Sequence, residues 1–232
     1  MDLQGRAAVI TGGGRGIGSA IARRLAENGA TVVVSARSVD EIESVAKGLQ
    51  SEGYEAHAIP CDVADETSVE MMAQEVSGRI GGIDIVVNNA GIARSNPVKL
   101  LTLEEWDRIL SINATGTFLC TRAFLGGMIE RGWGRVINVA SIAGLRGGPY
   151  MAAYSASKHA QIGFTRALAA EVADQGVTAN AICPGYVDTA MADYAVTRIV
   201  GKTDLSYEEA LQSILATNPQ KRLIRPEEVA HV

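Results

Sequence analysis

Short apolar runs alternate with stretches of helical periodicity along almost the whole chain, and this alternation limits the fold more than any other feature. The apolar runs are nearly continuous, which is typical of strands buried on both faces of a sheet. Strands that alternate with helices form a parallel sheet with right-handed crossovers. The chain is therefore predicted to be a doubly wound α/β protein. We expect strands at 7–10, 31–37, 55–60, 83–87, 135–141 and 177–183, and helices at 19–28, 38–52, 65–80, 102–131 and 152–174.

Tyr154 and Lys158 lie four residues apart in the last of these helices, so their side chains project from one face. A free tyrosine titrates at about 10, too high for an efficient acid at neutral pH. A neighbouring ammonium group favours the phenolate and lowers the phenol pKa, and a three-unit shift requires roughly 4 kcal/mol. A pair with this spacing can also be exposed and without function, so its interpretation depends on the rest of the chain.

A glycine-rich segment from Thr11 to Gly18 stands between the first predicted strand and the first helix. In this setting backbone N–H groups and a helix N-terminus hold a pyrophosphate. The common G-x-G-x-x-G pattern is not met, because Ile17 stands where a glycine would be needed. Ala36 and Arg37 end the next strand, where an NAD site would carry an acidic residue. Arg37 and Arg15 suit a 2′-phosphate instead, although each can also be a solvated loop charge.

Several polar or glycine-rich features follow strand ends, and in an open parallel sheet these ends share one rim. Ligands bind beyond that rim, so the position of these residues indicates a binding site. Taken singly, Ser141 can be a turn former and Asn88 a structural tie between strands. The features are the turn from Gly12 to Gly18, Arg37, Asp62, Asn88, Ser141 and Pro184.

The composition excludes several other functions. The net charge is −5 and there is no basic block, so we expect no nucleic-acid partner. The three cysteines are far apart in apolar runs, which predicts reduced core residues of a cytoplasmic protein. The three histidines show no ligand spacing, so no metal site is expected. There is no signal-peptide pattern and no apolar run of membrane-spanning length.

Taken together, these residues resemble the short-chain dehydrogenase/reductase family from about Gly5 to the last residue. The resemblance implies a Rossmann-type sheet with strand order 3-2-1-4-5-6. Members usually continue through a further helix to a seventh strand, whereas this chain stops at 227–232, so we expect a truncated chain that lacks this strand. The matching motifs are 11–18, Asp62, 88–91, Asn113, Ser141, Tyr154 with Lys158, 184–185 and Thr189.

The resemblance also implies a role for each of these residues. Tyr154 would exchange a proton with the substrate oxygen, and Ser141 would hydrogen-bond that oxygen. Lys158 would lower the Tyr154 pKa and bind the nicotinamide ribose, and Asn113 would hold a water molecule. Asn113 can alternatively be a local helix kink. The predicted catalytic residues are Asn113, Ser141, Tyr154 and Lys158. The predicted cofactor-binding residues are Gly12, Gly14, Arg15, Gly16, Ile17, Gly18, Arg37, Asp62, Val63, Asn89, Ala90, Gly91, Tyr154, Lys158, Pro184, Gly185, Val187 and Thr189.

The implied activity is hydride transfer between NADP(H) and a carbonyl or secondary alcohol. The sequence most resembles bacterial reductases of 3-oxoacyl thioesters and related ketones. The alternatives are an NAD-dependent secondary alcohol dehydrogenase and, more remotely, a non-catalytic dinucleotide sensor. Asp174-Gln175 supplies no basic residue for an acidic carrier protein, which favours CoA thioesters or free ketones. A homo-oligomer, tetramer or dimer, is expected.

We expect one domain over residues 1–232, in which residues 186–219 form a lid over the substrate site. Arg94 and Arg146 follow strand ends and could meet an anionic group, or be merely solvated. The pocket is expected to be partly apolar, with contributions from Met191, Tyr194, Ile199, Leu205, Ile142, Leu145 and Tyr150.

Overall fold

The computed structural model describes residues 2–216 and 218–232, and it is built around one six-stranded parallel sheet. The strand order is β3-β2-β1-β4-β5-β6, which confirms the predicted α/β fold and its strand order. Each predicted strand is present within a few residues of its predicted bounds. The strands are β1 (Ala7–Thr11), β2 (Thr31–Ala36), β3 (Ala56–Pro60), β4 (Ile85–Asn88), β5 (Gly134–Val139) and β6 (Val177–Ile182).

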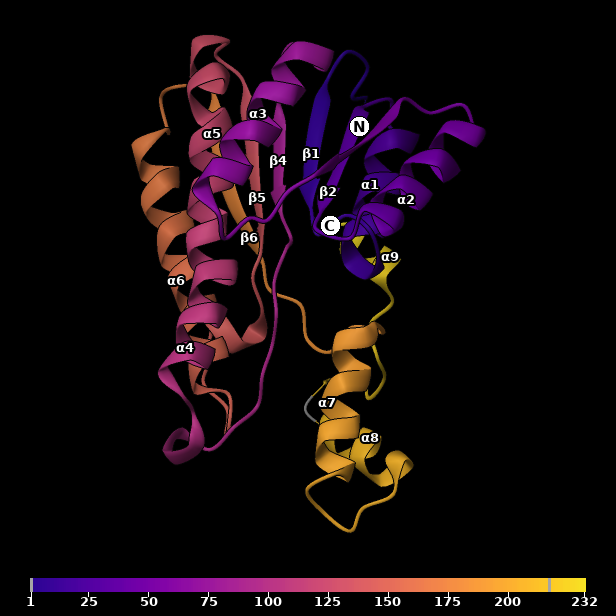
Figure 1. Cartoon of the computed structure of the whole chain (residues 1–232), viewed down its shortest axis with the longest axis vertical. Coiled ribbons are helices and arrows are strands. Elements are labelled where there is room, and N and C mark those ends of the chain that lie inside the picture. Colours follow the sequence, from indigo (N-terminus) through magenta and orange to yellow (C-terminus); the bar gives the residue numbers. More distant parts are fainter. Residues whose placement is uncertain (1, 217) are drawn as a thin grey trace.

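Helices cover both faces of this sheet (Figure 1). Successive strand residues point to opposite faces. Val9 and Val33 accordingly pack against α3 (Glu66–Ile80), α5 (Gly116–Glu130) and α6 (Ala152–Glu171). Ile10 and Val34 pack on the other side, against α1 (Gly16–Glu27) and α2 (Val39–Ser51). The nearly continuous apolar character of the strands follows from this two-sided burial. In the described part of the chain, no helix has the length and apolar character needed to cross a bilayer.

The single helix predicted over 102–131 is wrong in one respect, because a π-helical turn interrupts it. The segment divides into α4 (Leu103–Leu110), the π turn (Ser111–Thr115) and α5. A π turn accommodates one extra residue, and such turns are frequent at functional sites. Here the turn carries Asn113, which is fully buried. Gly116 follows it at a close contact with Val63, where an added Cβ would lie 2.8 Å from Val63 Cγ2. Periodicity alone does not reveal such a turn, since the apolar face continues through it.

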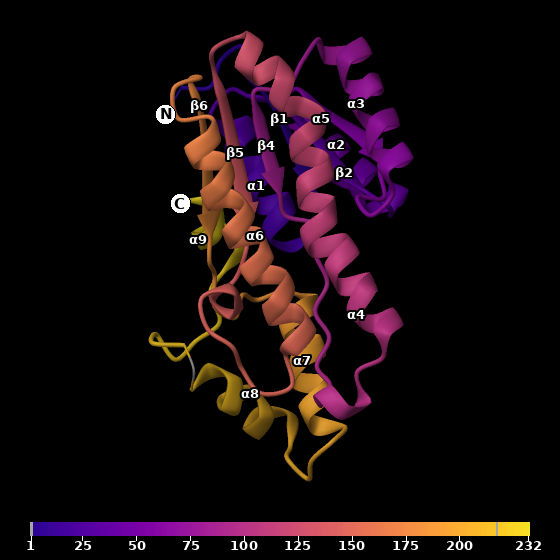
Figure 2. The same cartoon turned by 90° about the vertical axis from the view of Figure 1, so that its left-hand side faces the viewer.

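Two helices project beyond the carboxyl ends of the strands, where the lid was predicted (Figures 1 and 2). They are α7 (Ala190–Val200) and α8 (Tyr207–Leu215), and we call them the lid; that they cover a substrate site stays a prediction. Val196, Ala210 and Ile214 form a small core between them, separate from the two cores of the sheet. Ile199, predicted to line the substrate pocket, instead packs against this lid core. The lid is therefore a unit with its own packing.

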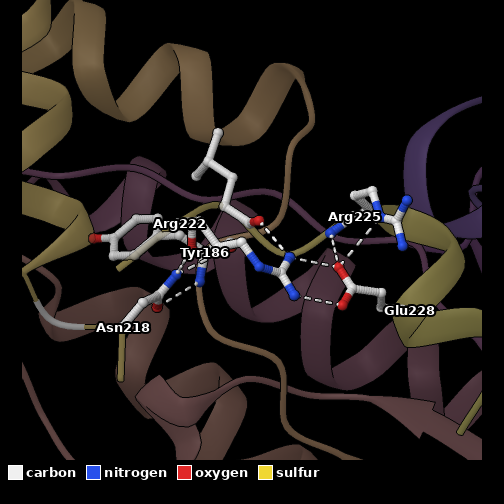
Figure 3. A network of polar contacts seen from close by, with 6 residues as sticks. Tyr186, Asn218, Arg222, Arg225 and Glu228 are labelled. Atoms are coloured by element: carbon white, nitrogen blue, oxygen red, sulfur yellow. Dashed lines mark hydrogen bonds and ion pairs between the residues drawn. The ribbon is translucent and has the colours of Figure 1, made fainter. Parts of the chain in front are cut away.

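The segments on either side of the lid are held together by one buried amide (Figure 3). The Asn218 side chain accepts a hydrogen bond from the Tyr186 backbone N–H at 3.3 Å and donates to the Arg222 carbonyl at 2.9 Å. Beside it, Val187 and Ile224 form a parallel β-bridge. We call the Asn218 side chain and this bridge the clasp.

An ion pair continues from the clasp toward the last helix, α9 (Pro226–Ala230), which packs against α1. Arg222 donates two hydrogen bonds of 2.6 Å to the Glu228 carboxylate. Glu228 also accepts from the Arg225 backbone N–H at 2.9 Å and so caps α9. The Arg222 guanidinium is the main reason that the pKa of Glu228 falls to about 2. The Glu228 carboxylate is therefore ionised at neutral pH.

We expect Asn218→Ala to loosen the base of the lid, because it removes a buried amide and leaves the partly buried Tyr186 N–H without its acceptor. An unsatisfied buried group of this kind costs about 1–3 kcal/mol. Hydrogen–deuterium exchange should accelerate in residues 186–188 and 222–224, and urea unfolding should show the loss of stability. Asn180→Ala is the control, since Asn180 is exposed on the edge strand β6. Equal exchange in both variants would contradict a specific role for the clasp.

Candidate active site

The glycine-rich turn after β1 is packed so closely that side chains cannot be added to it. A Cβ on Gly18 would lie 2.2 Å from the Gly12 carbonyl oxygen, and Gly12 itself has a φ of +64°. The Asn89 amide donates to the carbonyl oxygens of Thr11 and Gly12 at 3.0 and 3.1 Å. In return, the Thr11 hydroxyl accepts from the backbone N–H groups of Asn89 and Ala90, both at 3.1 Å. The segments after β1 and β4 are thus tied together.

The N-terminus of α1, beyond this turn, has the character of an anion site. Its cap residue Arg15 is extended and makes no side-chain hydrogen bond to the helix, and the first turn contains no acidic residue. The first backbone N–H groups of a helix have no internal partner, so they are available to a phosphate. Gly16, with a φ of +55°, lies beside Thr189, since an added Cβ would meet the Thr189 methyl group at 3.1 Å. The residues present therefore fit a dinucleotide, and the predicted residues Gly12, Gly14, Gly16, Gly18 and Thr189 lie together.

The two arginines predicted to bind a 2′-phosphate are exposed and paired with carboxylates. Arg15 lies 3.1 Å from Glu41, and Arg37 lies 3.7 Å from Asp62. Exposed pairs of this kind contribute about 0–1 kcal/mol, so a dianionic phosphate can replace the carboxylate partner. Arg37 and Asp62 also line one hollow of about 420 Å³ after β2 and β3, together with Pro60, Cys61, Ser68, Met71, Met72 and Glu75.

The other predicted cofactor residues differ in whether their side chains are buried and in what they contact. Val63 is buried against Gly116, so its side chain is a core residue and the predicted adenine contact is left to its backbone. Ile17 also packs against a sheet core. Val187 is buried in the clasp and Gly185 lies beside Asn218. Pro184 accepts a hydrogen bond through its carbonyl from Ile142 N–H at 3.0 Å.

Ser141 and Tyr154 lie together at the end of β5, both buried. Ser141 begins a short 3-10 turn (Ile142–Gly144), and its Oγ accepts from the Ala143 N–H at 3.1 Å. Gly144 allows this turn to touch α6, because an added Cβ would lie 2.7 Å from the Lys158 carbonyl oxygen. Burial raises the pKa of Tyr154, and its hydrogen bond with Ser141 acts in the opposite direction. Within the protein, Tyr154 is therefore a neutral phenol at physiological pH.

Lys158 lies one helical turn further along α6, with its ammonium nitrogen 5.8 Å from the centre of the Tyr154 ring. Nζ donates to the Val139 carbonyl at 2.9 Å and to the Gln161 side-chain oxygen at 2.7 Å. Burial lowers the pKa of Lys158 to about 7, and the nearby Cys183 acts in the opposite direction. The predicted lowering of the Tyr154 pKa by Lys158 stays a prediction, since inside the protein burial is the larger influence on both groups.

Asn113 is held by the π turn against the segment after β4. Its Oδ1 accepts from the Ile92 N–H at 2.8 Å, and its Nδ2 donates to the Ile92 carbonyl at 2.9 Å and to Ser157 Oγ at 2.9 Å. Asn113 Oδ1 and Lys158 Nζ approach Gly91 together, because a Cβ on Gly91 would lie 3.2 and 3.6 Å from them. The backbone at Asn113 is a π-helical turn, and the Asn113 side chain bonds to other segments and not within its own helix.

Several buried polar residues that hydrogen-bond to the predicted site residues on the interior side were not predicted from the sequence. Gln161 is buried on α6, at a position that shares the helix face of Tyr154 and Lys158. This seven-residue spacing from Tyr154 was a usable signal, because polar residues repeated along one helix face are unusual in a buried helix. Thr11, Thr117 and Ser157 carried no such signal, since their partners come from distant segments.

The lid meets the segment after β4 through arginines. Arg94 lies over the Tyr194 ring at 4.9 Å, and Arg198 donates to the Asn96 side chain at 2.7 Å. Arg94 therefore has an aromatic partner as well as solvent. Leu145 and Tyr150, predicted to line the pocket, are exposed.

Comparisons with known proteins agree with this arrangement. Residues 6–199 match the family described as short chain dehydrogenase. The chain is 41% identical over 227 residues to a putative ketoacyl reductase of Streptomyces coelicolor, covering 97% of this chain and 87% of that protein. It is 38% identical over 233 residues to the 3-oxoacyl-(acyl-carrier-protein) reductase FabG of Aquifex aeolicus, covering 100% and 90%. A crystal structure of a variant of actinorhodin polyketide ketoreductase with NADPH superposes with a TM-score of 0.94, at 41% identity, covering 97% of this chain and 87% of that one.

We expect Gly18→Ala to disrupt the glycine-rich turn, because the new methyl group would overlap the Gly12 carbonyl and the Asn89 amide. Overpacking of this kind costs about 1–3 kcal/mol. NADPH affinity, measured by calorimetry, should fall by at least about tenfold as the N–H groups of α1 move. Gly48→Ala is the matched control: Gly48 lies inside α2 with no neighbouring atom within 4 Å. It should raise stability by about 0.5–1 kcal/mol and leave NADPH affinity unchanged.

Proposed function

Because this chain belongs to the short-chain dehydrogenase family, we propose that it is an NADP(H)-dependent ketoreductase of 3-oxoacyl thioesters or closely related ketones. The observation that carries the proposal is the meeting of Ser141, Tyr154 and Lys158 beside Gly91, next to a groove built for a dinucleotide. The ketoreductase-type activity on ketones follows from the family and its relatives. The choice of NADP(H) and of the acyl thioester is the proposed part.

In this mechanism the nicotinamide cofactor supplies the hydride that reduces the carbonyl carbon. The Ser141 and Tyr154 hydroxyl groups, which lie together at the end of β5, both donate hydrogen bonds to the carbonyl oxygen. As negative charge develops on that oxygen, the Tyr154 O–H transfers its proton to it. Lys158 donates two of its three N–H groups to Val139 and Gln161, and the third would be available to a hydroxyl group of the nicotinamide ribose.

The electrostatics of the site favour the reductive direction. Reduction needs Tyr154 as a protonated phenol, and burial favours that form by raising its pKa. A free phenol is far more acidic than an alcohol. The ordinary acidities of the two groups therefore favour proton transfer from Tyr154 to the product oxygen. Oxidation would require the phenolate, which burial disfavours.

Three observations support NADP(H) over NAD(H). Ala36 and Arg37 stand at the end of β2, where an acidic residue would bond the ribose of NAD. Arg37 and Arg15 are exposed, and their carboxylate partners can be replaced by a phosphate. A relative of known structure, the actinorhodin polyketide ketoreductase, was crystallised with NADPH.

The acyl thioester is supported by the names of the relatives, among which ketoacyl and 3-oxoacyl reductases recur. The turn after α6 offers Asp174 and Gln175 rather than a basic residue for an acidic carrier protein, so a CoA thioester is the better substrate on this ground. The homo-oligomeric assembly and the cytoplasmic location stay predictions from the sequence.

We expect Tyr154→Phe to lower kcat at least about a hundredfold, because the general acid is lost, while NADPH affinity stays unchanged. The assay is NADPH oxidation with a 3-oxoacyl-CoA thioester, small diketones and cyclic ketones as substrates. Tyr54→Phe is the control, since Tyr54 packs at the core between α2 and β3 and lies far from the site. Turnover by Tyr154→Phe within a few-fold of the parent protein would refute the assigned acid.

We expect Arg37→Ala to raise KM for NADPH by about 10- to 100-fold, the effect of losing one hydrogen bond to a charged group. KM for NADH should change little, because that cofactor has no 2′-phosphate. Lys47→Ala is the control for loss of one exposed charge, since Lys47 pairs with Glu43 on the outer face of α2. If the parent protein uses NADH as well as NADPH, or better, the assignment of NADP(H) is wrong.

A further inference from the structure

Gln161 is almost completely enclosed, at 1% exposure, yet both ends of its amide are hydrogen-bonded. Its Oε1 accepts from Lys158 Nζ at 2.7 Å, and its Nε2 donates to Thr117 Oγ1 at 2.7 Å. A buried amide without partners would cost several kcal/mol, so such a residue persists only where each end is paired. Gln161 is thus a buried, fully hydrogen-bonded partner of Lys158.

The direction of these hydrogen bonds is fixed by chemistry. An ammonium group has only donors, so the carbonyl end of Gln161 must face Lys158. The NH₂ end then faces Thr117, whose hydroxyl accepts from it and donates to the Asn113 backbone carbonyl at 2.8 Å. One polar path therefore runs from Lys158 through Gln161 and Thr117 to the π turn that carries Asn113.

This path restricts the position of the ammonium group. Lys158 has three N–H donors. Two of them are taken by Val139 O at the end of β5 and by Gln161 Oε1 on α6. The remaining donor is directed by the geometry of the other two. With the Val139 carbonyl alone, the four-carbon side chain could rotate about that single contact, and the free donor would lose its direction.

We propose that Gln161 is a positioning residue for the ketone reduction: it holds the Lys158 ammonium at the reacting groups and couples it to the turn bearing Asn113. The inference rests on the proposed function for its catalytic consequence. Gln161 itself touches neither the substrate nor the cofactor, because it lies on the interior side of Lys158, against Thr117.

The proposal implies a pH signature. Among the residues described, the titratable groups that face Lys158 are Tyr154 on α6 and Cys183 beyond β6, and its two acceptors are neutral carbonyls. A carbonyl acceptor favours the charged form of an amine. Loss of the Gln161 carbonyl should therefore lower the pKa of Lys158, and a carboxylate in its place should raise it.

The test compares Gln161→Leu, which removes the acceptor at similar size, with Gln161→Glu, which keeps an acceptor and adds charge. The pKa of Lys158 is measured by NMR titration of its Cε resonance, which is assigned by its absence in Lys158→Ala. The kcat is measured from NADPH oxidation. In Gln161→Leu the Lys158 pKa should fall and kcat should drop by about 10- to 100-fold at nearly constant ketone KM. In Gln161→Glu the Lys158 pKa should rise, with kcat within about tenfold of the parent protein.

Thr165→Val is the matched control, because Thr165 is equally buried on α6 and its hydroxyl bonds Asn138 and the Gln161 backbone, not Lys158. It should lower Tm, but because the other contacts that hold α6 on the sheet remain, the Lys158 pKa should be unchanged.

A Lys158 pKa that is unchanged in both Gln161 variants, or shifted the same way in both, would overturn the proposal. If Gln161→Leu does not fold, absence of the upward shift in Gln161→Glu overturns it alone. A parent protein that reduces none of the ketones would refute the proposed function, whereas the opposite pKa shifts would still establish that Gln161 positions Lys158.

Discussion

A continuous chain of hydrogen bonds crosses the apolar interior from strand β4 to helix α6, and the position of the candidate catalytic residues depends on it. The Asn88 side chain donates to the Asn138 side chain at 2.8 Å, and Asn138 donates to the Thr165 hydroxyl at 2.8 Å. The Thr165 hydroxyl donates in turn to the Gln161 backbone carbonyl at 2.7 Å. In a low-dielectric interior each of these groups would be costly if left unpaired. Helix α6 therefore cannot slide or rotate on the sheet without breaking several of them, and Tyr154 and Lys158 keep their height above β5. These contacts support the predicted role of Asn88 as a structural tie between strands.

The cofactor groove depends on backbone proximity rather than on side-chain chemistry. Thr11 and Asn89 exchange hydrogen bonds between the segments after β1 and β4, and Gly18 touches Gly12 with no room for a methyl group. The segment after β6 joins the same place, where Thr189 lies beside Gly16. Three strand ends thus meet at one rim because the sheet is parallel, and the glycines let them approach closely enough to enclose a pyrophosphate.

Burial shifts the pKa values of Tyr154 and Lys158 so that each group favours its neutral form. It raises the pKa of Tyr154 and lowers that of Lys158 to about 7, so both groups are pushed toward their neutral forms. The lowering of the Tyr154 pKa by the Lys158 ammonium stays a prediction, because burial is the larger influence on both groups. What the site needs from Lys158 is a fixed position, and the carbonyls of Val139 and Gln161 provide it.

Most of the architecture was determined by the sequence alone. Apolar strands and amphipathic helices in strict alternation admit few folds, and the motif residues follow strand ends, so the rim that carries Tyr154, Ser141 and the glycine-rich turn could be predicted. The sequence did not determine contacts between segments distant along the chain. The π turn at Asn113, the burial of Val63 against Gly116, the packing of Ile199 within the lid and the partnership of Gln161 with Lys158 were decided by tertiary structure. The physical reason is that periodicity records which face of an element is buried, whereas the partner that a buried polar group finds there depends on how whole elements pack.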